Sequence, residues 1–112
     1  MALQKTKNLA DGTTGNYWRI ARITLDRHTL VCDAYLDLFI DQAHANSGAA
    51  PLNYKKHLIF SFTVPDFTAG ITITYVYTKI LAVASAMVIP VGGHPGDPTV
   101  PFDSDLAGAT VV

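Results

Sequence analysis

Charged residues are scarce in this sequence of 112 residues. They make up 15% of the chain, and apolar residues make up 49%, whereas an average soluble protein has about 25% charged residues. A domain of this size has a high ratio of surface to volume and cannot bury so much apolar area within itself. We therefore expect one domain that contacts other proteins, as a homo-oligomer within a larger assembly.

An excess of basic residues is also missing. The net charge is −1, and the lysines and arginines are scattered along the chain. A nucleic-acid-binding domain would instead concentrate positive charge on one face. The charge pattern therefore predicts no nucleic-acid partner.

Cysteine and long apolar runs are nearly absent. The single cysteine, Cys32, excludes an internal disulfide, and its place in an apolar strand pattern predicts a small buried side chain rather than a reactive thiol. Residues 1–12 lack the apolar core of a secretory signal. The longest apolar run, residues 80–90, is about half the ~20 residues that a membrane-spanning helix needs. We expect no membrane partner and folding in the cytoplasm.

No catalytic or metal-binding motif stands out. The serines lack a GxSxG elbow, the glycine-rich loop lacks the Gly-Lys-Ser/Thr of a phosphate loop, and the four histidines lack HxH or HxxxH spacing. His94 and Asp97 are the best candidates for a metal-binding pair, but their Gly- and Pro-rich surroundings are more typical of a turn than of a metal site. Asp33, Asp37 and Asp41 share one strand face, but at roughly 13 Å apart they suit solvent better than a single cation. We expect no enzyme activity, no metal and no cofactor.

Regular alternation of apolar residues marks the centre of the fold. From residue 30 to residue 41 every second position is apolar, which is typical of a strand with one buried and one solvated face. Residues 16–25 form a second β-prone run, and residues 26–28 would turn between the two. Further strands are predicted over residues 3–8 and 58–64.

Residues 71–89 fit two structures. β-branched side chains near the start favour a strand, whereas helical spacing and an alanine-rich second half favour a helix capped by Asp66 or Thr68. The pattern alone leaves both open. From residue 90 onward, prolines and glycines predict an extended arm that ends in apolar residues.

Two groups of apolar and aromatic side chains are candidates for partner contacts. If Tyr17 faces the core, the alternate residues of the first hairpin face away from it and form an exposed patch that docks a partner. The alternative is a second buried layer beneath the helix or the arm. The arm supplies the other group, because an apolar arm on a small domain usually lies on something. The candidate partner-binding residues are Trp18, Ile20, Tyr35, Phe39, Val100, Phe102, Val111 and Val112.

Three short motifs follow one another in an order that resembles a known family. They are Tyr-x-Arg-Ile-x-x-Ile-x-Leu-Asp at residues 17–26, Tyr-x-Tyr-x-Lys-Ile-Leu at residues 75–81, and Leu-Ala-Gly-Ala at residues 106–109. This order resembles short phage proteins encoded among tail and baseplate genes, whose pattern is similar to a β-meander, one helix and a short tail. The long apolar stretch after residue 81 departs from that pattern. The resemblance implies a helix over residues 71–87 and a structural role in the virion, and it assigns no catalytic or binding residues.

Together these features predict an α+β fold, with an antiparallel sheet of three to four strands, one packed helix and an extended C-terminal arm. Residues 1–89 would form the sheet and helix, and residues 90–112 the arm. The expected function is that of a bacteriophage virion structural protein in the tail, baseplate or fibre attachment, with other virion structural proteins as partners. The alternatives are a capsid decoration (cement) protein and a cytoplasmic binding or assembly module that never enters the particle.

Overall fold

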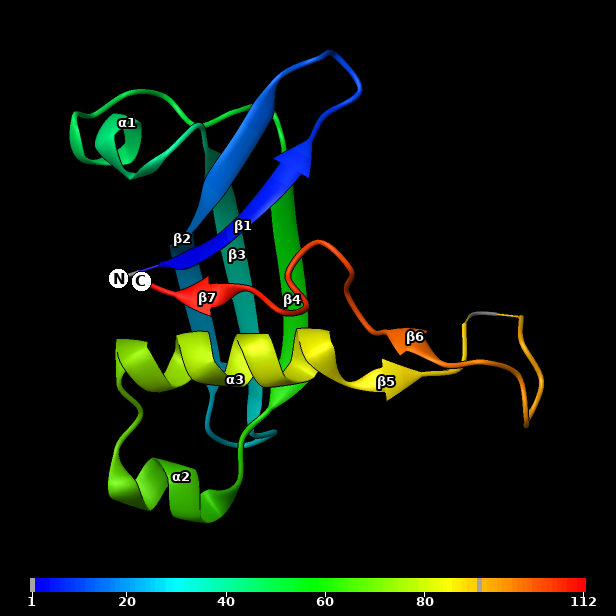
Figure 1. Cartoon of the computed structure of the whole chain (residues 1–112). Helices are drawn as coiled ribbons and strands as arrows, with labels where there is room; N and C mark the ends of the chain where they lie inside the picture. Colours follow the sequence, from blue (N-terminus) through cyan, green and yellow to red (C-terminus); the bar gives the residue numbers. More distant parts are fainter. Residues whose placement is uncertain (1, 91) are drawn as a thin grey trace.

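The computed structural model describes residues 2–90 and 92–112 and has an α+β fold (Figure 1). Its main strands are β1 (Leu3–Asn8), β2 (Thr14–Asp26), β3 (Val31–Phe39), β4 (Lys55–Ser61) and β7 (Thr110–Val111). They form a curled antiparallel sheet in the order β4-β3-β2-β1-β7. Helix α3 (Ile73–Ser85) lies across one face of this sheet.

The alternation predicted for residues 30–41 is confirmed in β3. Its fully buried residues, which pack against α3, are Cys32, Ala34, Leu36 and Leu38. The residues between them point to the opposite side of the sheet. We call the side that packs against α3 the inner face and the opposite side the outer face.

A β-bulge in β2 changes which residues face the core. The register with β3 shifts between Ile20 and Arg22, so Ala21 is an extra residue in the strand. The bulge reverses the alternation, and Trp18 before it and Ile23 after it both pack in the inner-face core. A strictly alternating strand would have put these two side chains on opposite faces.

Helix α3 resolves most of the ambiguity over residues 71–89 in favour of a helix, but it covers residues 73–85 rather than the expected 71–87, and residues 87–88 form a short strand. Its buried stripe consists of Val76, Tyr77, Ile80 and Ala84. Burial of this stripe against the sheet outweighs the strand preference of the β-branched residues. The hydroxyl of Tyr77 accepts a hydrogen bond from the backbone N–H of Ile20 at 2.8 Å, which satisfies a donor next to the bulge.

The helix starts differ from the prediction. A short helix, α2 (Val64–Ala69), precedes α3, and its N-cap is Thr63, which forms a capping box with Asp66. Thr72 caps α3 by accepting a backbone N–H of the first turn at 3.1 Å. The prediction that Asp66 or Thr68 caps the long helix is therefore wrong. A third helix, α1 (Gln42–Asn46), follows β3.

The C-terminal residues do not form an extended arm, which corrects the prediction for residues 90–112. β5 (Met87–Val88) and β6 (Val100–Pro101) pair as a hairpin that stands away from the sheet (Figure 1). The chain then returns to the body, where Leu106 is fully buried and β7 pairs with β1. Backbone hydrogen bonds of 2.8 and 2.9 Å join Ala2 to Val112. The main sheet thus has five strands instead of three to four, and residues from both expected parts of the chain contribute to it.

Candidate functional site

Trp18, the largest member of the expected aromatic patch, is not exposed. It is fully buried on the inner face, where its indole N–H donates to the carbonyl of Lys5 at 3.0 Å. Its ring meets that of Tyr54 edge-on, with 5.8 Å between centroids. The bulge at Ala21 is the reason, because it sets Trp18 and the partly buried Ile20 against the core. Both residues lie in the main core beneath α3, and Tyr17, which was expected to face that core, lies on the outer face.

Phe39 lies on the outer face but is also buried. It forms a small second core with Ala2, Tyr17 and Ala45, the last of which comes from α1. The guanidinium of Arg19 lies 4.7 Å from the centre of the Phe39 ring. The prediction of an exposed Phe39 is therefore wrong, because α1 and the start of the chain cover this end of the sheet.

The rest of the outer face carries a row of stacked side chains across three strands. Tyr35 of β3 pairs with Arg22 of β2, whose guanidinium is 4.4 Å from the ring centre, and with His57 of β4, whose ring lies parallel at 4.1 Å. His57 Nε2 lies 2.9 Å from a carboxylate oxygen of Asp33. Tyr35 is half-buried as a result. A hollow of about 310 Å³ beside this row is lined in part by Arg22, Tyr35 and Lys55.

The three aspartates that share one strand face in the sequence, Asp33, Asp37 and Asp41, each have a separate partner. Asp33 contacts the histidine of the stacked row, and Asp37 lies 3.9 Å from the ammonium of Lys55. Asp41 caps α1 by accepting the backbone N–H of His44 at 2.8 Å, and this hydrogen bond, with one to the His44 side chain, lowers the pKa of Asp41. Within the described residues, no three His, Cys, Asp or Glu side chains are grouped so that they could hold a metal ion.

Cys32 and the pair His94 and Asp97 have structural roles. The carboxylate of Asp97 accepts the backbone N–H of His94 at 2.8 Å and so closes a turn. Cys32 is fully buried, as predicted, and burial, with a smaller contribution from Asp33, raises the pKa of its thiol to about 11. The thiol therefore stays protonated at neutral pH, where the nucleophilic thiolate is scarce.

The hairpin, which the structure describes at residues 86–90 and 92–102, concentrates exposed apolar side chains. Met87, Ile89, Val100 and Phe102 are between 40% and 58% exposed. The backbone N–H of Phe102 donates to the carbonyl of Ala86 at 2.8 Å, which fixes the base of the hairpin to the end of α3. Val100 and Phe102, both candidate contact residues, therefore lie on a surface that another protein can reach.

Val111 and Val112, the last two candidates, lie at the edge of the main sheet. Their exposed fractions are 36% and 39%. β7 is the last strand in the sheet order, so its outer edge has no strand neighbour within the described part of the chain. Both valines are thus exposed next to an open strand edge.

A cluster of charges ties residues 103–112, which we call the C-terminal segment, to the sheet. Asp105 lies 2.8 Å from the ammonium of Lys56 and 2.9 Å from that of Lys7. It also accepts a hydrogen bond of 2.5 Å from the hydroxyl of Tyr54. Asp103, which is 9% exposed, lies 3.2 Å from Lys56. Sequence reasoning missed this cluster, because its members come from distant parts of the chain and share no local spacing.

Burial and pairing act in opposite directions on these charges. Burial would raise the pKa of Asp105, but hydrogen bonds from Lys56 and its other two partners outweigh burial and hold that pKa well below its usual range. Burial would likewise lower the pKa of Lys56, but its hydrogen bonds to Asp105 and Asp103 raise it. Both groups are therefore charged at neutral pH. Lys5 adds hydrogen bonds to two backbone carbonyls of the C-terminal segment.

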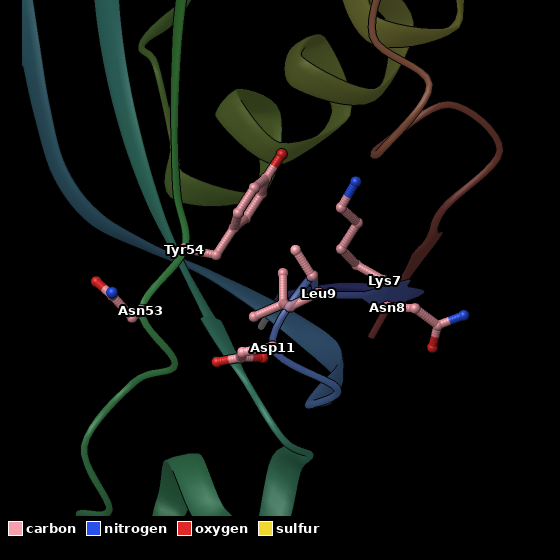
Figure 2. Close-up of a pocket in the computed structure, with 7 residues that line it drawn as sticks. Lys7, Asn8, Leu9, Asp11, Asn53 and Tyr54 are labelled. Carbon is pink, nitrogen blue, oxygen red and sulfur yellow. The ribbon is translucent and has the colours of Figure 1, made fainter.

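An open hollow of about 580 Å³ lies next to this cluster (Figure 2). Figure 2 shows Lys7 and Tyr54 extending in the same direction, away from Asp11 and Asn53. Both Lys7 and Tyr54 bind Asp105. Lys7 and Tyr54 therefore hold the C-terminal segment in place, and Asp11, the carboxylate that lines the hollow, accepts hydrogen bonds from Thr13.

No protein-family model matches the chain, and no curated protein or solved structure is significantly similar to it. Among residues 2–90 and 92–112, no helix has both the length and the apolar character needed to cross a bilayer. What the geometry offers is an exposed apolar hairpin and an ion-paired C-terminal segment. The exposed apolar surface of the hairpin is suited to contacts with other proteins, whereas the C-terminal segment is held on the sheet of its own chain.

Proposed function

We propose that this chain is a structural subunit of a bacteriophage particle, in the tail, baseplate or fibre attachment, and acts through contacts with other virion proteins. The observation that carries the proposal is the exposed apolar surface of the hairpin, which stands away from the sheet (Figure 1). The virion setting is supported by the three motifs whose order resembles short phage tail and baseplate proteins.

The hairpin is better suited to a protein interface than to water. Apart from a histidine, Asp97 is its one ionisable residue, and the carboxylate of Asp97 already accepts a backbone hydrogen bond. Interface cores are depleted in charged residues and enriched in Met and aromatic residues, and the hairpin exposes Met87 and Phe102. Each Å² of apolar area buried against a neighbour contributes roughly 25 cal/mol before ordering costs. A symmetric assembly repeats this contribution at every copy.

The location of the chain tests the virion setting. Particles produced from a genome that carries this gene are purified, heads and tails are separated, and each fraction is analysed by mass spectrometry. Presence in tails is the expected result. Presence in heads would instead identify a capsid decoration protein, and absence from both would identify a cytoplasmic binding or assembly module.

Charge introduced into the hairpin should block incorporation. We expect Met87→Asp combined with Phe102→Asp to lower the number of copies per particle at least about tenfold, because burying unpaired carboxylates in an interface costs several kcal/mol. Ile73→Asp is the matched control, since Ile73 is 50% exposed at the start of α3, where a carboxylate is favourable. Circular dichroism establishes that both variants fold. Equal incorporation of the two variants would contradict the hairpin as the contact surface.

A further inference from the structure

We propose that the C-terminal segment exchanges between two copies of this chain, with the hairpin opening to serve as the linker. In the exchanged dimer, residues 103–112 of each copy bind to the sheet of the other copy. They take the place that the other copy's own residues 103–112 fill in the closed chain. This inference goes beyond the virion proposal and does not rest on it, because it concerns only surfaces that the chain itself carries.

The C-terminal segment and its site on the sheet are complementary in charge and shape. The sheet supplies lysines and the segment supplies aspartates and carbonyls: Lys5, Lys7 and Lys56 face Asp103, Asp105 and the carbonyls of Ser104 and Ala107. Leu106 is fully buried in the main core, and β7 extends the sheet beside β1. Because all of these contacts join the segment to the rest of the chain, a second copy offers an identical set.

The connection between the sheet and the C-terminal segment is long and weakly held. Among the described residues, two residue pairs join its strands, Met87 with Pro101 and Val88 with Val100. Two backbone hydrogen bonds close its base, from Phe102 to Ala86 at 2.8 Å and from Asp103 to Ala84 at 3.0 Å. Once opened, the 17 residues of 86–102 span up to about 55 Å. The longest dimension of the molecule is 38 Å. The site on a neighbouring copy is therefore within reach.

Exchange also provides cover for side chains that the closed chain leaves exposed. In the closed chain, the apolar residues Met87, Ile89, Val100 and Phe102 are 40% to 58% exposed. Two opened linkers that run past each other can pair and cover these side chains, while every contact of the C-terminal segment is kept. The exchanged form thus buries more apolar area than the closed chain. The entropy that two chains lose when they associate opposes this gain. High local concentration in an assembly reduces that entropic opposition.

Cysteine pairing between β1 and β7 tests the exchange. Gln4 and Thr110 are partners in that ladder, at a Cα spacing compatible with a disulfide, and the buried Cys32 does not compete. Gln4→Cys and Thr110→Cys are made in separate chains, one of them with a size tag, and the two chains are co-expressed. After concentration and mild oxidation, a non-reducing denaturing gel should show a covalent mixed dimer whose yield rises with protein concentration.

Three controls make the result decisive. Asn8→Cys and Thr14→Cys in separate chains face each other between β1 and β2, which do not exchange, so they should give at least about tenfold less mixed dimer. In a second preparation the two chains are expressed and purified separately, and a disulfide between Val88→Cys and Val100→Cys is formed in each before they are mixed. This disulfide should keep the hairpin closed and abolish the mixed dimer that separately purified chains without it give. A chain with both Gln4→Cys and Thr110→Cys establishes that the disulfide forms. The exchange is overturned if the doubly substituted chain gives only an internal disulfide and the separate chains give no mixed dimer. This outcome does not depend on whether the protein is found in phage particles.

Discussion

Gly15 leaves no room for a side chain in β2. A Cβ at this position would lie 2.7 Å from the carbonyl oxygen of Phe39 and 2.8 Å from side-chain atoms of Leu38 and Leu52. The backbone N–H of Leu52 donates to the carbonyl of Leu38 at 2.7 Å, so these neighbours are tied to each other. The requirement for glycine here is one of space and not of backbone conformation.

We expect Gly15→Ala to lower the free energy of unfolding by about 1–3 kcal/mol, the usual cost of overpacking. Urea unfolding followed by the fluorescence of the single tryptophan measures the change. Gly12 is the control, because it has a φ of 90° and no atom within 4 Å of an added Cβ. Gly12→Asn should therefore cost less than Gly12→Ala, since Asn tolerates positive φ. At Gly15 the larger Asn should cost more, and the opposite order would contradict the steric explanation.

Side-chain orientation is predictable from the sequence only where a strand is regular. Cys32 and Leu38 lie on the face that the alternation predicts. Trp18 does not, because the extra residue at Ala21 shifts the alternation and no residue type in β2 indicates a bulge. Asp105 contacts its lysines only because the chain returns to the sheet, so its role could not be predicted from local spacing.

Among the elements, α3 shows how burial overrides local preference. Its β-branched residues disfavour a helix by a few tenths of a kcal/mol each, whereas full burial of an apolar side chain such as Ile80 contributes about 1.5–3 kcal/mol. The helical spacing, which the pattern alone could not separate from a strand, therefore corresponds to the element that forms. Its start was not predictable in the same way, because α2 intervenes and leaves Thr72 as the cap.

Removing the cap of α3 should weaken the whole fold. We expect Thr72→Ala to lower the free energy of unfolding by about 1 kcal/mol, because the N–H of Tyr75 loses its acceptor. Thr72→Ser should retain most of the stability. Thr74→Ala, on an exposed position of the same helix, should be neutral or slightly stabilising. Thermal denaturation followed by circular dichroism compares the three variants, and equal melting temperatures for Thr72→Ala and Thr74→Ala would show that the cap contributes nothing.

At the scale of the whole molecule, the C-terminal segment completes a sheet that the sequence predicts only in part. The α+β class follows from the long strands and the helix. β5, β6 and β7 have two residues each, which is too short for a periodic pattern, since strand patterns need about four to eight residues. The return of the chain to β1 therefore depends on tertiary contacts, chiefly those of Leu106 and Asp105.

Asp105 makes the binding of the C-terminal segment to the sheet dependent on pH. Its pKa in the folded chain is lower than its usual value of about 3.9. Its pairing therefore adds stability that is present above that usual value and is lost as the pH falls through the folded pKa. The raised pKa of Lys56 adds stability that is lost only as the pH rises above about 10.4. We expect the contribution of this cluster to be constant between about pH 6 and pH 9 and to fall in acid.

Asp105→Asn isolates the contribution of this one charge. At pH 7 we expect a loss of about 2–3 kcal/mol in the free energy of unfolding, because Lys7 loses its charged partner and Lys56 keeps only Asp103. Below about pH 4 the difference from the original chain should shrink, since Asp105 of the unfolded chain takes up a proton that folding must release. Asp97→Asn, which removes a carboxylate from the exposed hairpin, should change the profile little. Urea unfolding at a series of pH values gives both curves, and a loss that does not vary with pH would mean that Asp105 acts through its shape rather than its charge.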